Sequence, residues 1–160
     1  MASFFEALEA RCKAVDSLLC IGLDPHKKEL GDSPSADAAA EFCLKLIEAT
    51  SPVAAAYKPN AAFFEVFGAD GATALKRVIA AVPDGIPVLL DAKRGDIGTT
   101  AEAYASAAFD DAKVRRPACV SHATVVLGLT CAKLCSGHPG HRPRASPSIH
   151  TWVGIRLSHS

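Results

Sequence analysis

Three short apolar runs, each followed by a charged residue, limit the possible folds of this chain more than any other feature. The runs begin near residues 17, 53 and 86, roughly 35 residues apart. That spacing matches the length of a β-strand plus a crossover helix. Continuous apolar strands are also typical of parallel sheets that are buried on both faces. We therefore predict a parallel α/β protein, either a TIM barrel or a doubly wound sheet.

Two observations favour the barrel. No G-x-G-x-x-G pattern follows the first apolar run, which disfavours a dinucleotide-binding sheet. Asp24, Lys58 and Asp91 each follow one of the three runs, and barrels display their functional groups at the carboxyl ends of the strands. The predicted fold is therefore of the TIM (β/α)8-barrel type, incomplete, with three or four β/α units.

Hydrophobic periodicity and capping residues predict the individual elements. The predicted strands cover 17–23, 52–57 and 86–90, and the predicted helices cover 3–14, 36–50, 70–82 and 99–110, with a helical turn at 61–67 and a loop at 25–35. Asp70 is expected to cap the third of these helices, and Thr99 with Glu102 forms a capping box for the fourth. The run 118–129 fits either a fourth strand or an apolar stretch without regular structure.

Composition changes abruptly near Asp111. Residues 1–111 contain 10 Lys/Arg and all 17 Asp/Glu, a net charge of −7, whereas residues 112–160 contain 7 Lys/Arg and no acid, a net charge of +7. We predict that 1–111 forms the N-terminal half of a barrel. We expect 112–160 to be a divergent basic tail, either disordered or read from a shifted frame. Its basic residues are scattered and Trp152 is its one aromatic, so we expect no nucleic-acid partner.

Other function classes find little support in the sequence. No apolar run approaches the ~20 residues that a membrane span needs, and the N-terminus lacks a signal-peptide pattern. We read the six cysteines as free thiols of a reducing compartment, which indicates a cytoplasmic protein. A zinc site built from the tail is disfavoured because the spacing departs from common ligand patterns. Its candidate ligands are Cys131, Cys135, His138 and His141.

The most charged of the strand ends lies in the stretch VLLDAKRGDIGTTAEAYA, residues 88–105. A lysine between two carboxylates, as Lys93 is between Asp91 and Asp96, stays protonated and can serve as a general acid. A fixed aspartate that faces a substrate anion repels the ground state and is relieved when that charge leaves. The alternative is a solvated cluster of salt bridges, which would add little to stability.

These residues resemble the orotidine 5′-monophosphate decarboxylase family. DAKRGDIGTTAEAYA is similar to the family's D-x-K-x-x-D motif, which is followed by Ile and a Thr, and LLCIGLDP and AAYKPNAAFFEVFG are similar to its first- and second-strand regions. The resemblance covers about residues 3–111 in the same order and spacing.

The resemblance implies a carboxy-lyase that converts orotidine monophosphate to uridine monophosphate and CO2 in pyrimidine biosynthesis, without a metal or cofactor. Lys93 would protonate C6 of the pyrimidine, Asp91 would face the substrate carboxylate, and Lys58 would extend the charge array. Asp24 would contact the ribose.

The resemblance also implies a homodimer in which Asp96, together with Ile97 and Thr100, reaches into the partner's site. Family members are full eight-stranded barrels, and 112–160 shows no counterpart of their phosphate-gripping loop. We therefore expect weak or absent activity. Two alternatives stay open: a magnesium-dependent sugar-phosphate decarboxylase or synthase of the same superfamily, and a catalytically inactive barrel fragment.

Overall fold

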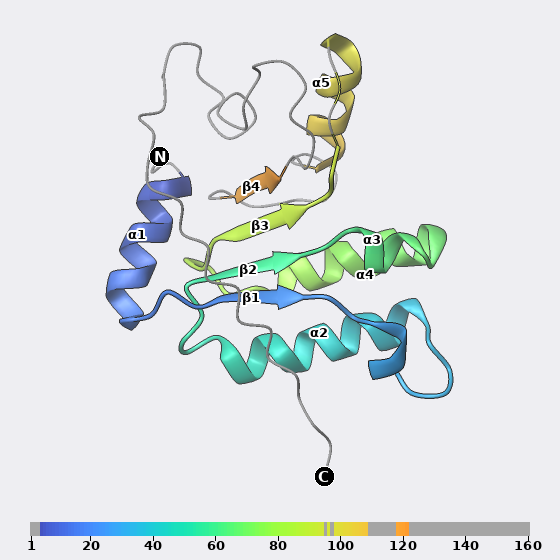
Figure 1. The fold of residues 1–160 in the computed structure, drawn as a ribbon, viewed down its shortest axis with the longest axis horizontal. Coiled ribbons are helices and arrows are strands. Elements are labelled where there is room, and N and C mark those ends of the chain that lie inside the picture. The colour runs from blue at the N-terminus through green and yellow to red at the C-terminus, as the bar shows by residue number, and fades with distance from the viewer. Residues whose placement is uncertain (1–3, 95, 97, 109–117, 122–160) are drawn as a thin grey trace.

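The fold is a parallel sheet with helices between its strands (Figure 1). It is seen in a computed structural model that describes residues 4–94, 96, 98–108 and 118–121. The strands of this part are β1 (Cys20–Leu23), β2 (Ala56–Pro59), β3 (Val88–Asp91) and β4 (Ala118–Ser121). They pair in parallel and in sequence order, β1-β2-β3-β4.

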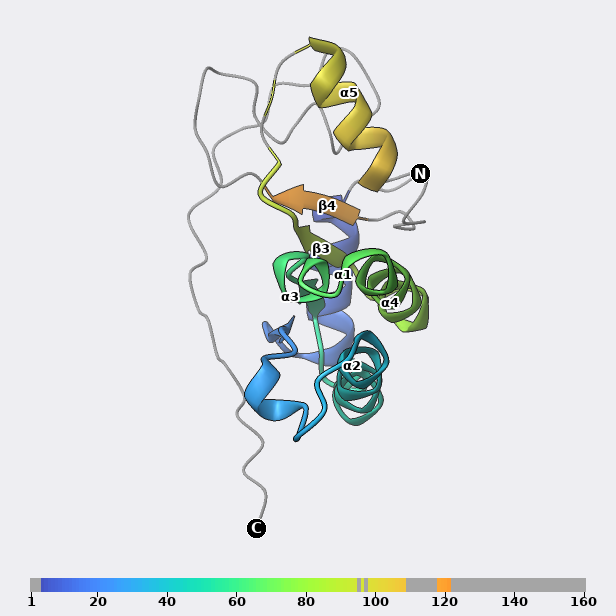
Figure 2. The same ribbon diagram turned by 90° about the vertical axis from the view of Figure 1, so that its right-hand side faces the viewer.

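A helical segment follows each of the first three strands. The helices are α1 (Phe4–Val15), α2 (Ala36–Thr50), α3 (Ala62–Glu65), α4 (Gly68–Ala81) and α5 (Gly98–Ser106), with a 3-10 turn, η1 (Lys27–Glu29), after β1. The two long helices α2 and α4 lie on the same face of the sheet and pack against each other (Figure 2). A doubly wound sheet has helices on both faces and a reversal of strand order. The observed arrangement is instead that of successive β/α units in a barrel.

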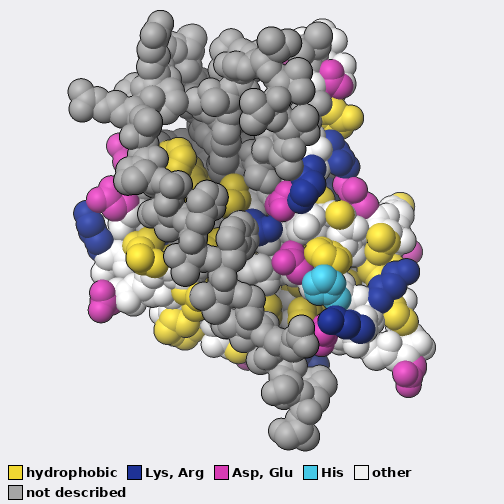
Figure 3. Space-filling view, viewed as in Figure 1, with side chains coloured by type: hydrophobic (Ala, Val, Ile, Leu, Met, Phe, Trp, Pro, Cys, Tyr) yellow, Lys and Arg dark blue, Asp and Glu magenta, His cyan; other side chains and the backbone are white. Residues whose placement is uncertain are grey.

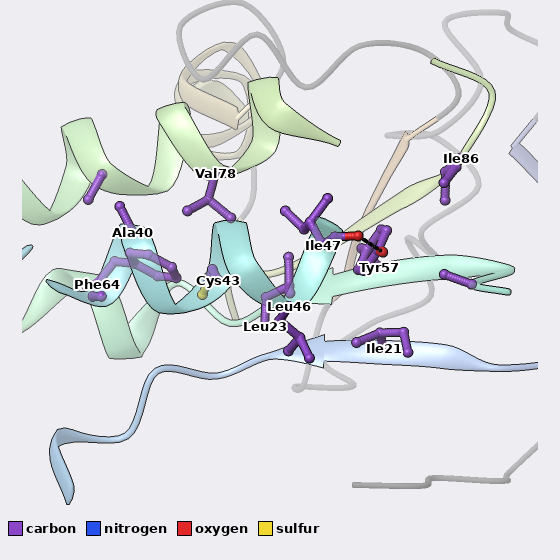
Figure 4. Packing of buried hydrophobic residues seen from close by; sticks show 13 residues of the cluster. Ile21, Leu23, Ala40, Cys43, Leu46, Ile47, Tyr57, Phe64, Val78 and Ile86 are labelled. Atoms are coloured by element: carbon purple, nitrogen blue, oxygen red, sulfur yellow. Dashed lines mark hydrogen bonds between the residues drawn. The ribbon is translucent and has the colours of Figure 1, made fainter. Parts of the chain in front are cut away.

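The core fills the space between the sheet and the helices α2 and α4 (Figure 4). Leu23 and Tyr57 from the strands, Cys43 from α2 and Val78 from α4 are all buried there. The Tyr57 hydroxyl makes hydrogen bonds with Thr50 Oγ1 (2.8 Å) and the Ile47 carbonyl (3.1 Å), so its burial leaves no polar group unsatisfied.

Strand alternation decides which residues face away from this core. Successive side chains of a strand point to opposite faces, and in β1 the buried residues are Ile21 and Leu23. Gly22 therefore faces the other way, and in the register of the sheet it lies opposite Lys58. Asp91 lies three residues after Val88, which pairs with Tyr57, so its side chain shares the face of Lys58.

The predicted elements are confirmed with shifted boundaries. Strand β2 begins at Ala56 rather than near residue 52, because Pro52 and Val53 lie in the turn that ends α2. The apolar run 118–129 does include a strand at Ala118–Ser121, and the rest of the run is outside the described residues. The loop predicted at 25–35 contains the turn η1.

The prediction that Asp70 caps the helix expected at 70–82 is wrong. Helix α4 begins at Gly68, its cap position is Phe67, and Asp70 lies within the first turn. The helix starts early because Gly68 adopts a left-handed φ of 62°, which lets α4 follow α3 almost directly. None of the described helices is long and apolar enough to span a membrane.

Gly71 allows α3 and α4 to approach closely, and its replacement tests this packing. A Cβ at this position would lie 1.8 Å from the Phe64 carbonyl oxygen, which is backbone and cannot rotate away. Helix propensity alone would make Gly71→Ala stabilising by about 0.5–1 kcal/mol. We expect a loss of about 1–3 kcal/mol in the free energy of unfolding instead, because the helices must separate. Urea unfolding measures this free energy. Ala72→Ser, at the next and exposed position, is the control. A stabilised Gly71→Ala variant would contradict the packing.

Candidate active site

The centre of the site is the carboxylate of Asp91, which lies between two lysines. Asp91 ends β3, and its Oδ2 lies 3.1 Å from Nζ of Lys58 while its Oδ1 lies 2.8 Å from Nζ of Lys93. Among the described residues Lys58 is the one buried charged side chain, 7% exposed. A buried ammonium group needs a paired carboxylate, so these contacts account for the burial.

The backbone around Asp91 places these groups at the carboxyl edge of the sheet. The Ala61 amide donates to the Asp91 carbonyl (3.0 Å), which extends the β2–β3 pairing beyond the strand ends. Lys93, two residues on, has a left-handed φ of 49° that non-glycine residues rarely adopt. The turn brings its ammonium group back onto Asp91. Figure 3 shows acidic, basic and histidine side chains gathered on the right-hand part of the molecule, the side toward which the strands run in Figure 1.

Asp24, just after β1, is the second carboxylate of the site. Burial raises its pKa, and the positive charges of Lys58, His26 and Lys93 oppose this only in part. Its Oδ1 is buried and accepts no hydrogen bond from the part of the chain that the structure describes. Gly22 makes room for this side chain, since a Cβ there would lie 2.9 Å from Asp24 Oδ2. Asp24 Oδ1 is thus an acceptor close to the charges of Lys58 and Lys93, and the described residues offer it no donor.

The structure brings four of the predicted site residues together: Asp24, Lys58, Asp91 and Lys93. Asp96 and Thr100 are exposed, Asp96 just before α5 and Thr100 within its first turn. Ile97 is outside the described residues, as are the four candidate zinc ligands of the tail. The described part contains no group of three His, Cys, Asp or Glu residues that could hold a metal ion.

Two side chains near the site had no assigned role from the sequence. Arg94 pairs with Glu65 of α3 and donates to the Ala92 carbonyl (2.9 Å). His26 is exposed, and its ring packs edge-on against Phe63 with centroids 4.4 Å apart. The one sequence signal for Arg94 was its place between Lys93 and Asp96.

Cys12, Cys20 and Cys43 are free thiols. Cys43 is buried in the core, and burial raises the pKa of its thiol to about 12. Cys12 and Cys20 are only partly buried.

Comparison with known proteins decides the family. The model of the family described as orotidine 5′-phosphate decarboxylase / HUMPS matches residues 17–125. The chain belongs to this family.

Named relatives agree with this family assignment. The orotidine 5′-phosphate decarboxylase of Herpetosiphon aurantiacus is 54% identical over 110 residues, which cover 68% of this chain and 41% of that protein. The one from Roseiflexus sp. is 51% identical over 110 residues, 68% of this chain and 40% of that protein. The chain therefore spans about two fifths of the length of these curated relatives.

Solved structures confirm the fold class, a TIM-barrel type. The Leishmania donovani OMP decarboxylase superposes with a TM-score of 0.64 at 55% identity, covering 74% of this chain and 44% of that one. The UMP synthase of the same organism superposes with a TM-score of 0.65 at 54% identity, covering 75% of this chain and 25% of that one. The family resemblance seen in the sequence is thus confirmed, while the domain boundary at 111 stays a prediction.

The raised pKa of Asp24 makes a prediction about stability and pH. The folded state holds the Asp24 proton more tightly than the unfolded state, whose pKa is near 3.8. The stability that this proton contributes is fully present below that value and is lost as the pH rises through the folded pKa. We expect Asp24→Asn, which removes the buried charge, to melt at a higher temperature than the parent at pH 7. The gain should shrink as the pH falls toward 3.8, which thermal melts across pH 3–7 can measure.

Asp37→Asn is the matched control, because that aspartate is almost fully exposed on α2. It should change the melting temperature little at any pH in this range. A parent chain that melts above Asp24→Asn at pH 7 would contradict the assignment of a desolvated carboxylate.

Proposed function

We propose that this site decarboxylates orotidine monophosphate to uridine monophosphate. The observation that supports it most directly is the Asp91 carboxylate held between Lys58 and Lys93. Because both lysines hold it, this carboxylate has little freedom to turn away from a bound anion. Such a fixed charge suits a reaction in which a substrate anion must leave.

In the proposed reaction the substrate carboxylate lies against Asp91, and the repulsion raises the energy of the bound ground state. The bond between C6 and the carboxylate breaks, CO2 leaves, and the electron pair stays on C6. Lys93 Nζ then donates a proton to C6, and the lysine takes up a proton from water after product release. The Lys93 side chain is about half exposed, so its Nζ can reach a ligand while it stays paired with Asp91.

Lys58 and Asp24 have binding roles in this proposal. Lys58 pairs with Asp91 from the sheet side, and its positive charge lowers the cost of placing Asp24 and Asp91 in one site. Asp24 Oδ1 is an acceptor without a donor in the described part, and a sugar hydroxyl would supply one. The ribose would thus be recognised at the end of β1.

The remaining expectations belong to the proposal as well. A homodimer would bring Asp96, with Ile97 and Thr100, into the partner's site, and the exposure of Asp96 and Thr100 is compatible with such a contact. A cytoplasmic location fits the reading of the cysteines as free thiols of a reducing compartment. Because the sequence of 112–160 shows no counterpart of the family's phosphate-gripping loop, we propose that the 160-residue chain binds nucleotide but turns it over slowly.

Nucleotide binding can be tested without turnover. We expect uridine monophosphate to raise the melting temperature of the 160-residue chain, since a ligand at 100 times its Kd stabilises by about 2.7 kcal/mol. Asp24→Ala should lose most of this shift because the ribose acceptor is removed, whereas Asp37→Ala on α2 should keep it. Equal shifts in all three proteins would count against the assigned site. No shift in the parent chain would indicate an inactive fragment.

Turnover is a separate prediction. We expect the chain alone to release CO2 from orotidine monophosphate far below the median enzyme rate of about 10 per second. Any residual rate should disappear in Lys93→Met, which is unbranched and one atom shorter than lysine but has no proton to give. Trapping of labelled CO2 measures both. An ordinary rate in the parent chain, or an unchanged rate in Lys93→Met, would refute this part of the proposal.

A further inference from the structure

Arg94 contacts the turn that carries Lys93 and two helices beside it. Its Nη1 donates to the Ala92 carbonyl (2.9 Å), and its Nη2 pairs with Glu65 of α3. Its guanidinium carbon lies 5.8 Å from the ring centroid of Tyr104 on α5. Figures 1 and 2 show α3 and α5 on opposite sides of the carboxyl end of β3. Arg94 therefore joins the end of β3 to a helix on each side.

The neighbouring residue needs such support. Lys93 has a left-handed φ of 49°, which is unfavourable for a non-glycine residue and persists only where the surroundings enforce it. Its side chain is about half exposed, and its Nζ contacts Asp91 Oδ1. A single ion pair at the end of a long, half-exposed side chain contributes little by itself to holding a backbone conformation. Arg94, one residue later, makes the additional contacts that can hold the turn in this conformation.

The chemistry of the guanidinium suits this role better than that of an ammonium group. Its planar fork can donate to the Ala92 carbonyl and to Glu65 at once while its face lies toward an aromatic ring. A lysine carries its donors on a single atom and has no planar face, so it could not reproduce this set of contacts.

We propose that Arg94 is a positioning residue that holds Lys93 against Asp91 by anchoring the turn to α3 and α5. The inference deepens the proposed function and rests on it for the meaning of Lys93, but the geometric part can be tested by itself. Arg94 does not touch the reacting atoms in this account and acts through Lys93 alone.

The direct test follows the Lys93 amine by NMR after reductive methylation with ¹³C, which leaves the charge in place. Loss of the signal in Lys93→Arg assigns the resonance. In Arg94→Ala we expect it to move toward the position of an exposed lysine such as Lys45, because the contact with Asp91 opens. Arg94→Lys should give a smaller shift in the same direction.

Arg77→Ala is the matched control, since it removes another exposed arginine–glutamate pair, that between α4 and Glu41 of α2. It should leave the Lys93 resonance in place. If Arg94→Ala does not fold, Glu65→Gln replaces it, because this removes one contact from an exposed position and should move the resonance part of the way. An unchanged Lys93 resonance in folded Arg94→Ala would overturn the proposal. If Glu65→Gln has to replace that variant, an unchanged resonance in Glu65→Gln would overturn it.

Kinetics give a second test wherever the parent chain turns over. A misplacement of about 1 Å can reduce a rate about a hundredfold, so kcat should fall by that order in Arg94→Ala while KM changes little, with partial recovery in Arg94→Lys. A purely structural role would lower the amount of active protein in Arg94→Ala and Arg77→Ala alike, and that result would overturn the proposal. A parent chain without turnover would count against the proposed function alone, and the Lys93 resonance would then decide the role of Arg94.

Discussion

The contact of one carboxylate with two lysines connects the fold of this chain to its chemistry. Asp91 at the end of β3 holds Lys58 of β2 on one oxygen and Lys93 of the following turn on the other. Without Asp91, the buried Lys58 would lose the carboxylate that its burial requires, and Lys93 would lose the partner that fixes its ammonium group. The same contact therefore supports the sheet edge and orients the proposed proton donor.

The rest of the described structure serves to bring these groups to one edge. Parallel pairing in sequence order puts the ends of β1, β2 and β3 side by side, and strand alternation turns Gly22, Lys58 and Asp91 away from the helices. The core under α2 and α4 fixes that register, because a slip by one residue would exchange Tyr57 with Lys58. A polar site thus occupies one face of strands whose other face is fully apolar.

Much of this could be predicted from the sequence because it depends on local pattern. The repeat of apolar runs gave the parallel sheet, and the charged residues after the runs gave Asp24, Lys58 and Asp91. Boundaries were less accurate: β2 starts four residues later than predicted, and α4 starts at Gly68 rather than Asp70. Propensity did not show that α3 and α4 join almost without a loop, which depends on the backbone of Gly68 and on the space left by Gly71.

The contacts of Arg94 and the orphan oxygen of Asp24 could not be predicted in this way. The first joins residues 29 positions apart in the chain, and the second depends on burial by neighbouring segments. Both are consequences of packing between elements, which a periodicity or a motif does not encode. The family motif contains both Asp91 and Lys93, and the structure shows how these two residues contact each other.

The most direct test of the central claim compares how tightly substrate and product bind when the Asp91 charge is removed. If Asp91 repels the substrate carboxylate, Asp91→Asn should bind orotidine monophosphate more tightly relative to uridine monophosphate than the parent chain does. Stopped-flow binding, read before any turnover, gives both dissociation constants. We predict that the Kd of orotidine monophosphate divided by the Kd of uridine monophosphate falls at least tenfold in Asp91→Asn, which corresponds to about 1.4 kcal/mol. A ratio that stays the same or rises would contradict the account.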